Sequence, residues 1–142
     1  MSVWRIGSRW SKKGDETKSL IQVFIKNKVV FCGSDVADED GIKSGDIVAI
    51  ADGHKIIAVC RAITDQAKVS GNLGFTSTDI ENLGNDVFEI IKHAVGVKVD
   101  NIIKLSEPIT YNYPATMTLI QDAEVRNKVQ EVYDKCTWSE LD

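Results

Sequence analysis

The sequence predicts an α+β domain, built on a small, strongly curved β-sheet or a pseudobarrel with covering helices. Short β-branched segments joined by tight turns predict the strands, and two stretches with helical spacing of apolar residues predict the helices. A doubly wound α/β fold is disfavoured because regular helices do not separate the strands. The chain has no internal repeat and no linker, so we expect residues 1–142 to form a single domain.

The first elements along the chain are a short strand and a helix. Residues 3–7 alternate apolar and polar side chains, although imperfectly, and this pattern predicts a short strand. A turn-rich polar stretch follows at 11–16. Apolar residues then recur at a spacing of four and predict a helix over about 17–26. The all-apolar run at 29–32 predicts a buried strand.

A β-hairpin over residues 45–62 is the clearest element of the sequence. Two β-rich segments meet at Asp52 and Gly53, and an Asp-Gly pair readily adopts the positive φ angles of a tight turn. The acidic stretch before the hairpin, at 38–44, is expected to be a surface connection.

A polar loop and further strands follow the hairpin. The loop is predicted over 64–75, and a brief helix at 78–81, where a threonine and a glutamate have capping-box spacing. The β-branched segments at 87–91 and 95–99 predict two strands or one long bent strand, with Gly96 marking a bulge.

The last part of the chain predicts a sheet edge, a strand and a helix. Pro108 and Pro114 bracket an aromatic segment that cannot easily be a central strand, so it is expected in a loop or at a sheet edge. Residues 116–120 predict the final strand, and the helical spacing from 122 predicts an amphipathic helix to about residue 136.

The composition is that of a soluble globular protein. With 43% hydrophobic and 27% charged residues, the 142-residue chain can bury one sizeable core. No apolar run approaches the roughly 18 residues that span a bilayer, so no membrane interaction is expected. The first residues lack the apolar core and cleavage site of a secretory signal, which predicts a cytoplasmic location.

Metal and cofactor chemistry is not expected. Cys32, Cys60 and Cys136 lie far apart, with no Cys-x-x-Cys pair and only two histidines, which argues against a zinc site and a disulfide framework. No phosphate loop, dinucleotide fingerprint, nucleophile elbow or zinc-protease signature occurs. We therefore expect no cofactor and no enzymatic activity.

The charge is unevenly distributed along the chain. The formal net charge is -4, yet residues 1–31 contain seven basic and two acidic residues. An acidic protein resists non-specific binding to polyanions, but a local basic cluster can still form a polyanion-binding face. A solvated charged edge would explain the same cluster without a ligand.

The segment from Trp4 to Trp10 combines the groups that a base-binding site requires. Two tryptophans provide flat stacking surfaces, arginines provide guanidinium groups, and small residues let a ligand approach the backbone. Trp4 is expected to belong largely to the core, whereas Trp10, flanked by polar residues, is the better ligand-facing ring. Tyr111 and Tyr113, from the proline-bracketed segment, would add further walls. The candidate nucleic-acid-binding residues are Arg5, Ser8, Arg9, Trp10, Lys12, Lys13, Tyr111 and Tyr113.

The stretch 42–53, continuing to 56–59, resembles the hairpin of PUA-like domains, in which a Gly-Asp pair starts a barrel strand. This superfamily contains the EVE, YTH and ASCH domains. The early tryptophan, the predicted first helix and the run from 95–99 to 105–109 are also similar in order to EVE-like domains, which accompany modification-dependent restriction and other prokaryotic defence proteins. The resemblance implies a pseudobarrel with a pocket for a modified or flipped base.

The leading hypothesis is a non-enzymatic module that binds DNA or RNA, with a modified base as target. Trp10 would stack on the base, Arg5 and Arg9 would contact phosphate or base edge, and Lys12 and Lys13 would add phosphate contacts. Such a module can also be fused to an effector domain.

Two other classes of function stay open at this stage. A protein-interaction or oligomerisation domain would use the terminal helix, through its valines at 125, 129 and 132 and through Trp138. An enzyme acting on a nucleotide would take its general acid or base from Asp46, Asp52, Glu89 or His93.

Overall fold

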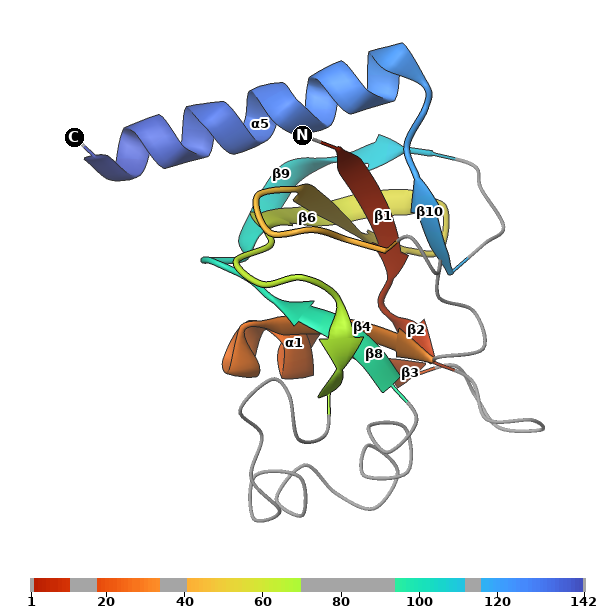
Figure 1. The fold of residues 1–142 in the computed structure, drawn as a ribbon. Helices are drawn as coiled ribbons and strands as arrows, with labels where there is room; N and C mark the ends of the chain where they lie inside the picture. The colour runs from red at the N-terminus through yellow and green to blue at the C-terminus, as the bar shows by residue number, and fades with distance from the viewer. Residues whose placement is uncertain (1, 11–17, 34–40, 70–93, 112–115, 142) are drawn as a thin grey trace.

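The chain folds into an α+β structure, seen in a computed structural model that describes residues 2–10, 18–33, 41–69, 94–111 and 116–141 (Figure 1). The described elements are a five-stranded sheet, a three-stranded sheet, a two-stranded ribbon and two helices. The α+β class predicted from the sequence is confirmed. The described sheets do not close into a barrel, because the five-stranded sheet keeps β10 and β9 as its edges.

The five-stranded sheet, called the main sheet below, has the strand order β10-β1-β5-β6-β9. The pair β1 and β5 is parallel, and the other neighbouring pairs are antiparallel. Its strands are β1 (Val3–Gly7), β5 (Ile47–Asp52), β6 (Lys55–Arg61), β9 (Ile103–Thr110) and β10 (Met117–Leu119).

The three-stranded sheet, called the small sheet, is antiparallel and has the order β4-β8-β7. Its strands are β4 (Val29–Gly33), β8 (Ala94–Lys98) and β7 (Ala67–Lys68). A bridge between Ala62 and Val99 connects the end of β6 to the end of β8, so the two sheets meet at one corner.

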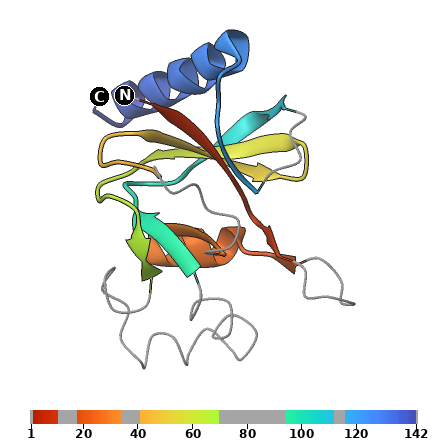
Figure 2. The ribbon, with the colours of Figure 1, turned by 45° about the vertical axis from the view of Figure 1, so that its right-hand side comes forward.

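Both faces of the main sheet are buried, and β5 shows why. Its run of apolar residues alternates between two clusters: Ile47 and Ala49 face α5, whereas Val48 and Ile50 face the small sheet and α1. A strand covered on both sides needs apolar residues at every position, which explains the continuous apolar sequence. The result is three layers: α5 (Ala123–Leu141), the main sheet, and the small sheet with α1 (Ile21–Asn27) (Figure 2).

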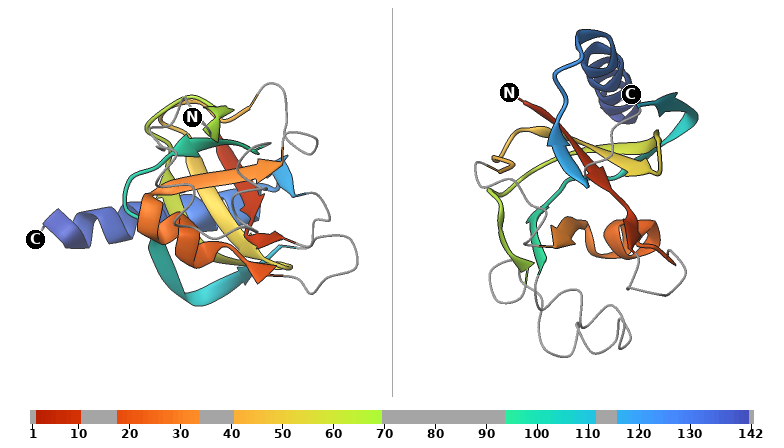
Figure 3. Two further views of the ribbon diagram at one scale, coloured as in Figure 1. Left: turned by 90° about the horizontal axis from the view of Figure 1, so that it is seen from below. Right: turned by 90° about the vertical axis from the view of Figure 1, so that its right-hand side faces the viewer.

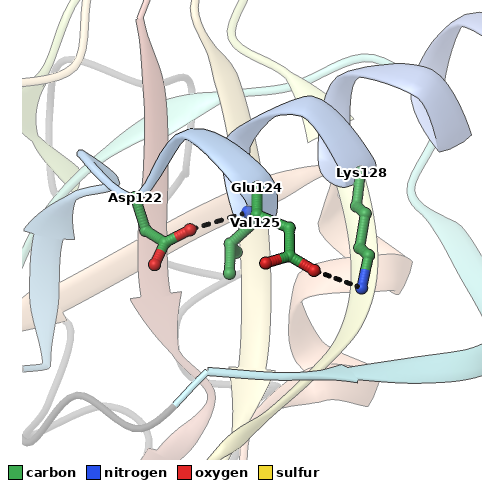
Figure 4. A network of polar contacts seen from close by, with 4 residues as sticks. All are labelled: Asp122, Glu124, Val125 and Lys128. Carbon is green, nitrogen blue, oxygen red and sulfur yellow. Dashed lines mark hydrogen bonds and ion pairs between the residues drawn. The ribbon is translucent and has the colours of Figure 1, made fainter.

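The start of α5 is fixed by its own sequence. Asp122 is the residue before the helix, and its Oδ1 accepts a hydrogen bond of 3.0 Å from the backbone N–H of Val125 (Figure 4). This side-chain cap satisfies one of the free N–H groups of the first turn. Glu124 and Lys128 form an exposed ion pair of 3.5 Å one turn apart, which adds little to stability.

Most elements agree with the sequence, and the differences have physical reasons. The helix predicted over 17–26 begins later, at Ile21, because Lys18–Ser19 forms the short strand β3. The final helix is longer than predicted and ends at Leu141. The predicted elements within 70–93 lie outside the described residues.

Gly96 does not mark a bulge, because the register between β4 and β8 is continuous across it. A Cβ at this position would lie 2.1 Å from the carbonyl oxygen of Val30 and 2.8 Å from the Cβ of Phe31. The glycine is needed for the close approach of the two strands.

Candidate nucleic-acid interface

The parallel pairing of β1 with β5 brings the N-terminal basic segment to one end of the main sheet. Gly7, at the end of β1, is opposite Ala51 near the end of β5. The chain leaves the sheet at Ser8, whose backbone N–H and side-chain Oγ each donate a hydrogen bond of 2.8 Å to the carbonyl oxygen of Ala51. Ser8 is fully buried, so it anchors the exit of the chain and does not face solvent.

A two-stranded antiparallel ribbon, called the ribbon below, begins directly after Ser8. It consists of β2 (Arg9–Trp10) and β3 (Lys18–Ser19), with Trp10 opposite Lys18 in the register. Two candidate residues, Arg9 and Trp10, therefore lie in the ribbon, and Lys12 and Lys13 belong to the segment 11–17, which lies outside the described residues.

Arg5 occupies the interior next to this exit. Only 5% of the residue is exposed, and its Nη2 donates a hydrogen bond of 2.8 Å to the carbonyl oxygen of Gly53. Its Nη1 donates a longer one of 3.4 Å to the carbonyl oxygen of Thr116. Burial lowers the pKa of Arg5, and the neighbouring Tyr111 offsets part of that shift. In this position the guanidinium connects β1 to the turn between β5 and β6 and to the start of β10, and little of it is exposed to solvent.

Tyr111 lies at the same end of the main sheet. It follows β9, and its backbone N–H donates a hydrogen bond of 2.8 Å to the carbonyl oxygen of His54 in the exposed turn after β5. The side chain is partly buried against the apolar cluster between the main sheet and α5. Tyr113 lies outside the described residues.

The fold thus gathers five of the eight candidate residues, from both ends of the chain, at one end of the main sheet. Arg5 and Ser8 differ from their expected role, because burial gives them backbone partners in place of a ligand. Lys18 joins the ribbon although the sequence placed it in a helix. Strands of two residues carry too little periodicity to be recognised, and the polar stretch between them was the only signal of a hairpin.

Trp4 belongs to the core, as the sequence predicted, and it explains the role of Asp46. The indole Nε1 of Trp4 donates a hydrogen bond of 3.1 Å to Asp46 Oδ2. The same carboxylate accepts hydrogen bonds from the backbone N–H groups of Ser2, at 3.0 Å, and Lys43, at 2.9 Å. Asp46 is 8% exposed, and these three contacts give it a structural function. Of the other acid–base candidates, Asp52 is partly buried in the turn, and those at 89 and 93 lie outside the described residues.

Within the described residues, no group of three or more His, Cys, Asp or Glu side chains could hold a metal ion. Cys32 and Cys60 are buried free thiols. The Sγ of Cys32 lies 3.9 Å from the Sδ of Met117 inside the core. Burial, helped by Asp100, raises the pKa of Cys60 well above its usual range, so this thiol stays protonated and unreactive.

Comparison with known proteins adds no relative: no family model, curated protein or solved structure matches this chain. Among the helices that the structure describes, none is both long and apolar enough to cross a membrane.

Proposed function

We propose that this chain is a non-enzymatic nucleic-acid-binding module of the PUA-like type, which contacts a base and the neighbouring phosphates through the ribbon. The observation that supports it most is the register of β2 and β3, which places Trp10 opposite Lys18 in a ribbon that also contains Arg9 and leads into Lys12 and Lys13. The ribbon thereby carries an aromatic residue and two cations, and two further lysines follow β2 in the sequence.

The physical requirements of such a site are met by these residue types. Lysine and arginine neutralise phosphates and release counterions, and an indole ring stacks on any base. A two-stranded ribbon is also narrow enough to enter the major groove of a duplex. Arg5 and Ser8 act here as positioning residues, because Arg5 bonds the β5–β6 turn and Ser8 bonds the end of β5 at the base of the ribbon.

The hairpin of β5 and β6 supports the PUA-like assignment. This hairpin and the Gly-Asp pair that ends at Asp46, just before β5, are the features that resemble PUA-like domains. In such domains the target base is read in a pocket, and a modified or flipped base is the target class that we propose. Whether the nucleic acid is DNA or RNA is decided by the experiment below.

A titration with labelled oligonucleotides tests the proposal. DNA and RNA probes with unmodified, methylated and hydroxymethylated bases are compared at low and moderate salt. Arg9→Ala and Lys12→Ala are expected to weaken binding to all probes and to reduce the salt slope by about 1 each. Trp10→Ala is expected to remove the preference for the target base.

The matched control is Lys128→Ala, which removes the same charge as Lys12→Ala from the exposed face of α5, beyond the main sheet. It should bind as the unchanged protein does. Tryptophan emission gives a second readout: a change on binding that is lost in Trp10→Ala is assigned to Trp10, over the emission of Trp4 and Trp138. Absence of binding to every probe, or equal losses in the Lys128 and Lys12 variants, would contradict the proposal.

Protein interaction through α5 is the second candidate, and one observation favours it. The C-terminal turns of α5 extend past the main sheet (Figure 3). Val129 and Tyr133 are buried against the sheet. The valine face that was expected to dock on a partner therefore packs largely against the main sheet of the same molecule. The protruding end would have to bind the partner, and deletion of 137–142 should then abolish oligomerisation or capture. An unchanged sedimentation profile would exclude self-association.

A further inference from the structure

A second basic surface lies at the C-terminal end of α1, whereas the ribbon lies at its N-terminal end. Gln22 and Lys26 are one helical turn apart and exposed, while Phe24 is fully buried against the core. The helix Ile21–Asn27 contains no acidic residue. Its solvent side is therefore polar and basic.

Two more lysines extend this surface. Lys28 follows α1 and is exposed, and its carbonyl oxygen accepts a hydrogen bond of 3.0 Å from the backbone N–H of Val99. Lys98 is opposite Val29 in the register of β4 and β8, and its neighbour Val99 is the residue bonded to Lys28, so the two lysines are close along the backbone. We call Lys26, Lys28 and Lys98 the lysine patch.

The conformation of Lys28 is unusual for its residue type. Its φ of 51° and ψ of 46° lie in the left-handed region, where glycine is the common residue after a helix. A lysine at this position adds a positive charge at the cost of backbone strain.

Among the described residues, no carboxylate forms an ion pair with the lysine patch. Asp100 accepts hydrogen bonds from the backbone N–H of Arg61 and from the hydroxyl of Tyr133. Asp65 accepts one from the backbone N–H of Ser44. Across the part of the chain that the structure describes, the ion pairs found are on α5, and none involves the lysine patch.

The ribbon and the lysine patch are joined by α1. The backbone N–H of Leu20, just before the helix, donates a hydrogen bond of 2.6 Å to the carbonyl oxygen of Ser8 at the base of the ribbon. Seven helical residues span about 10 Å. This length corresponds to the rise of about three base pairs along the axis of a duplex, at about 3.4 Å each.

We propose that a nucleic-acid strand bound at the ribbon continues along the exposed face of α1, and that Lys26, Lys28 and Lys98 hold its phosphates. This inference rests on the proposed function and names the path of the ligand beyond the base that is read. The lysine patch contacts phosphate alone, so it adds affinity without preference for a base.

Three single variants test the path: Lys26→Ala, Lys28→Gly and Lys98→Ala. Fluorescein-labelled oligonucleotides of about 4 and about 16 nucleotides span the range of site sizes found for single-strand-binding folds, and a duplex of the longer sequence is included. Each variant should weaken binding of the long probes and reduce their salt slope by about 0.7 for a single strand or about 0.9 for a duplex. The short probe is expected to contact the ribbon alone, so its binding should stay unchanged.

Lys28→Gly separates binding from folding. Because glycine relieves the left-handed strain, this variant should melt at a higher temperature than the unchanged protein while it binds the long probe less tightly. Lys135→Ala, which removes an exposed charge from α5, is the matched control and should leave both affinity and slope unchanged.

The outcomes distinguish this inference from the proposed function. If ribbon variants weaken binding and all three lysine-patch variants bind the long probe normally, the path along α1 is wrong and the ribbon site stands. If the lysine-patch variants alone weaken binding, nucleic acid binds at the lysine patch without the ribbon, and both the path from the ribbon and the proposed base-reading site are wrong. Equal losses in Lys135→Ala, or no binding to any probe, overturn the path as well.

Discussion

Asp46 connects the start of β1 to the segment before β5, and its replacement by asparagine gives a quantitative test of that role. In the structure Oδ1 accepts the N–H of Ser2, and Oδ2 accepts both the indole N–H of Trp4 and the N–H of Lys43. An asparagine has one acceptor oxygen, so at best it keeps the two contacts of Oδ2. Its NH2 group then faces the N–H of Ser2, and two donors oppose each other.

The expected cost follows from these contacts. A hydrogen bond to a charged group contributes about 1.5–3 kcal/mol, and loss of the charge roughly halves the strength of those that remain. Because the contacts with Ser2 and Lys43 are only partly buried, we expect a total loss of about 3 kcal/mol for Asp46→Asn. For a chain of 142 residues the entropy of unfolding is about 0.3 kcal/mol per degree, so the melting temperature should fall by about 10 °C.

Urea denaturation and calorimetry measure this change, and Asp65→Asn provides the matched control. Asp65 is exposed and accepts one hydrogen bond, of 2.9 Å, from the N–H of Ser44, so its loss should cost about 1 kcal/mol or less. If both variants were equally stable, or if Asp46→Asn lost less than about 1 kcal/mol, the structural role assigned to Asp46 would be refuted.

Three further predictions concern the rest of the core. Gly96→Ala should cost about 3 kcal/mol or more, since its Cβ would lie 2.1 Å from the carbonyl oxygen of Val30, and a urea midpoint near that of the unchanged protein would disprove the close approach. Tyr133→Phe removes a hydrogen bond of 2.5 Å to Asp100 and should lower the free energy of unfolding by about 1.5–3 kcal/mol, measured by the same titration. The raised pKa of Cys60 keeps its thiol protonated in the folded state, so stability is fully present below the ordinary cysteine pKa of about 8.5 and is lost as the pH rises above it. Cys60→Ala should reduce this alkaline loss, and an identical pH profile in the two proteins would contradict it.

Several elements could be predicted because their signals are local. The hairpin of β5 and β6 follows from an apolar run on each side of Asp52 and Gly53, and Gly53 has the positive φ of 64° that such a turn requires. The cap and the valine spacing of α5 also lie within a few residues of each other. Local sequence is sufficient where the contact partners are neighbours in the chain.

Other features depended on contacts between distant residues. The sequence identified Arg5 as a cation but could not show that the carbonyl oxygens of Gly53 and Thr116 would surround its guanidinium. The two-residue strands of the ribbon were missed, and with them the place of Lys18 opposite Trp10. Such pairings depend on which segments the whole fold brings together, and two residues have no measurable period.

The sequence alone determined the α+β class, the order of the main strands and helices, and the basic and aromatic character of the N-terminal segment. These properties depend on residue type and short-range spacing. The tertiary structure decided which of the described residues of that segment are buried. The parallel pairing of β1 with β5 buries Arg5 and Ser8 and places Arg9 and Trp10 in a ribbon beyond the sheet, because burial is set by long-range packing that no short stretch of sequence contains.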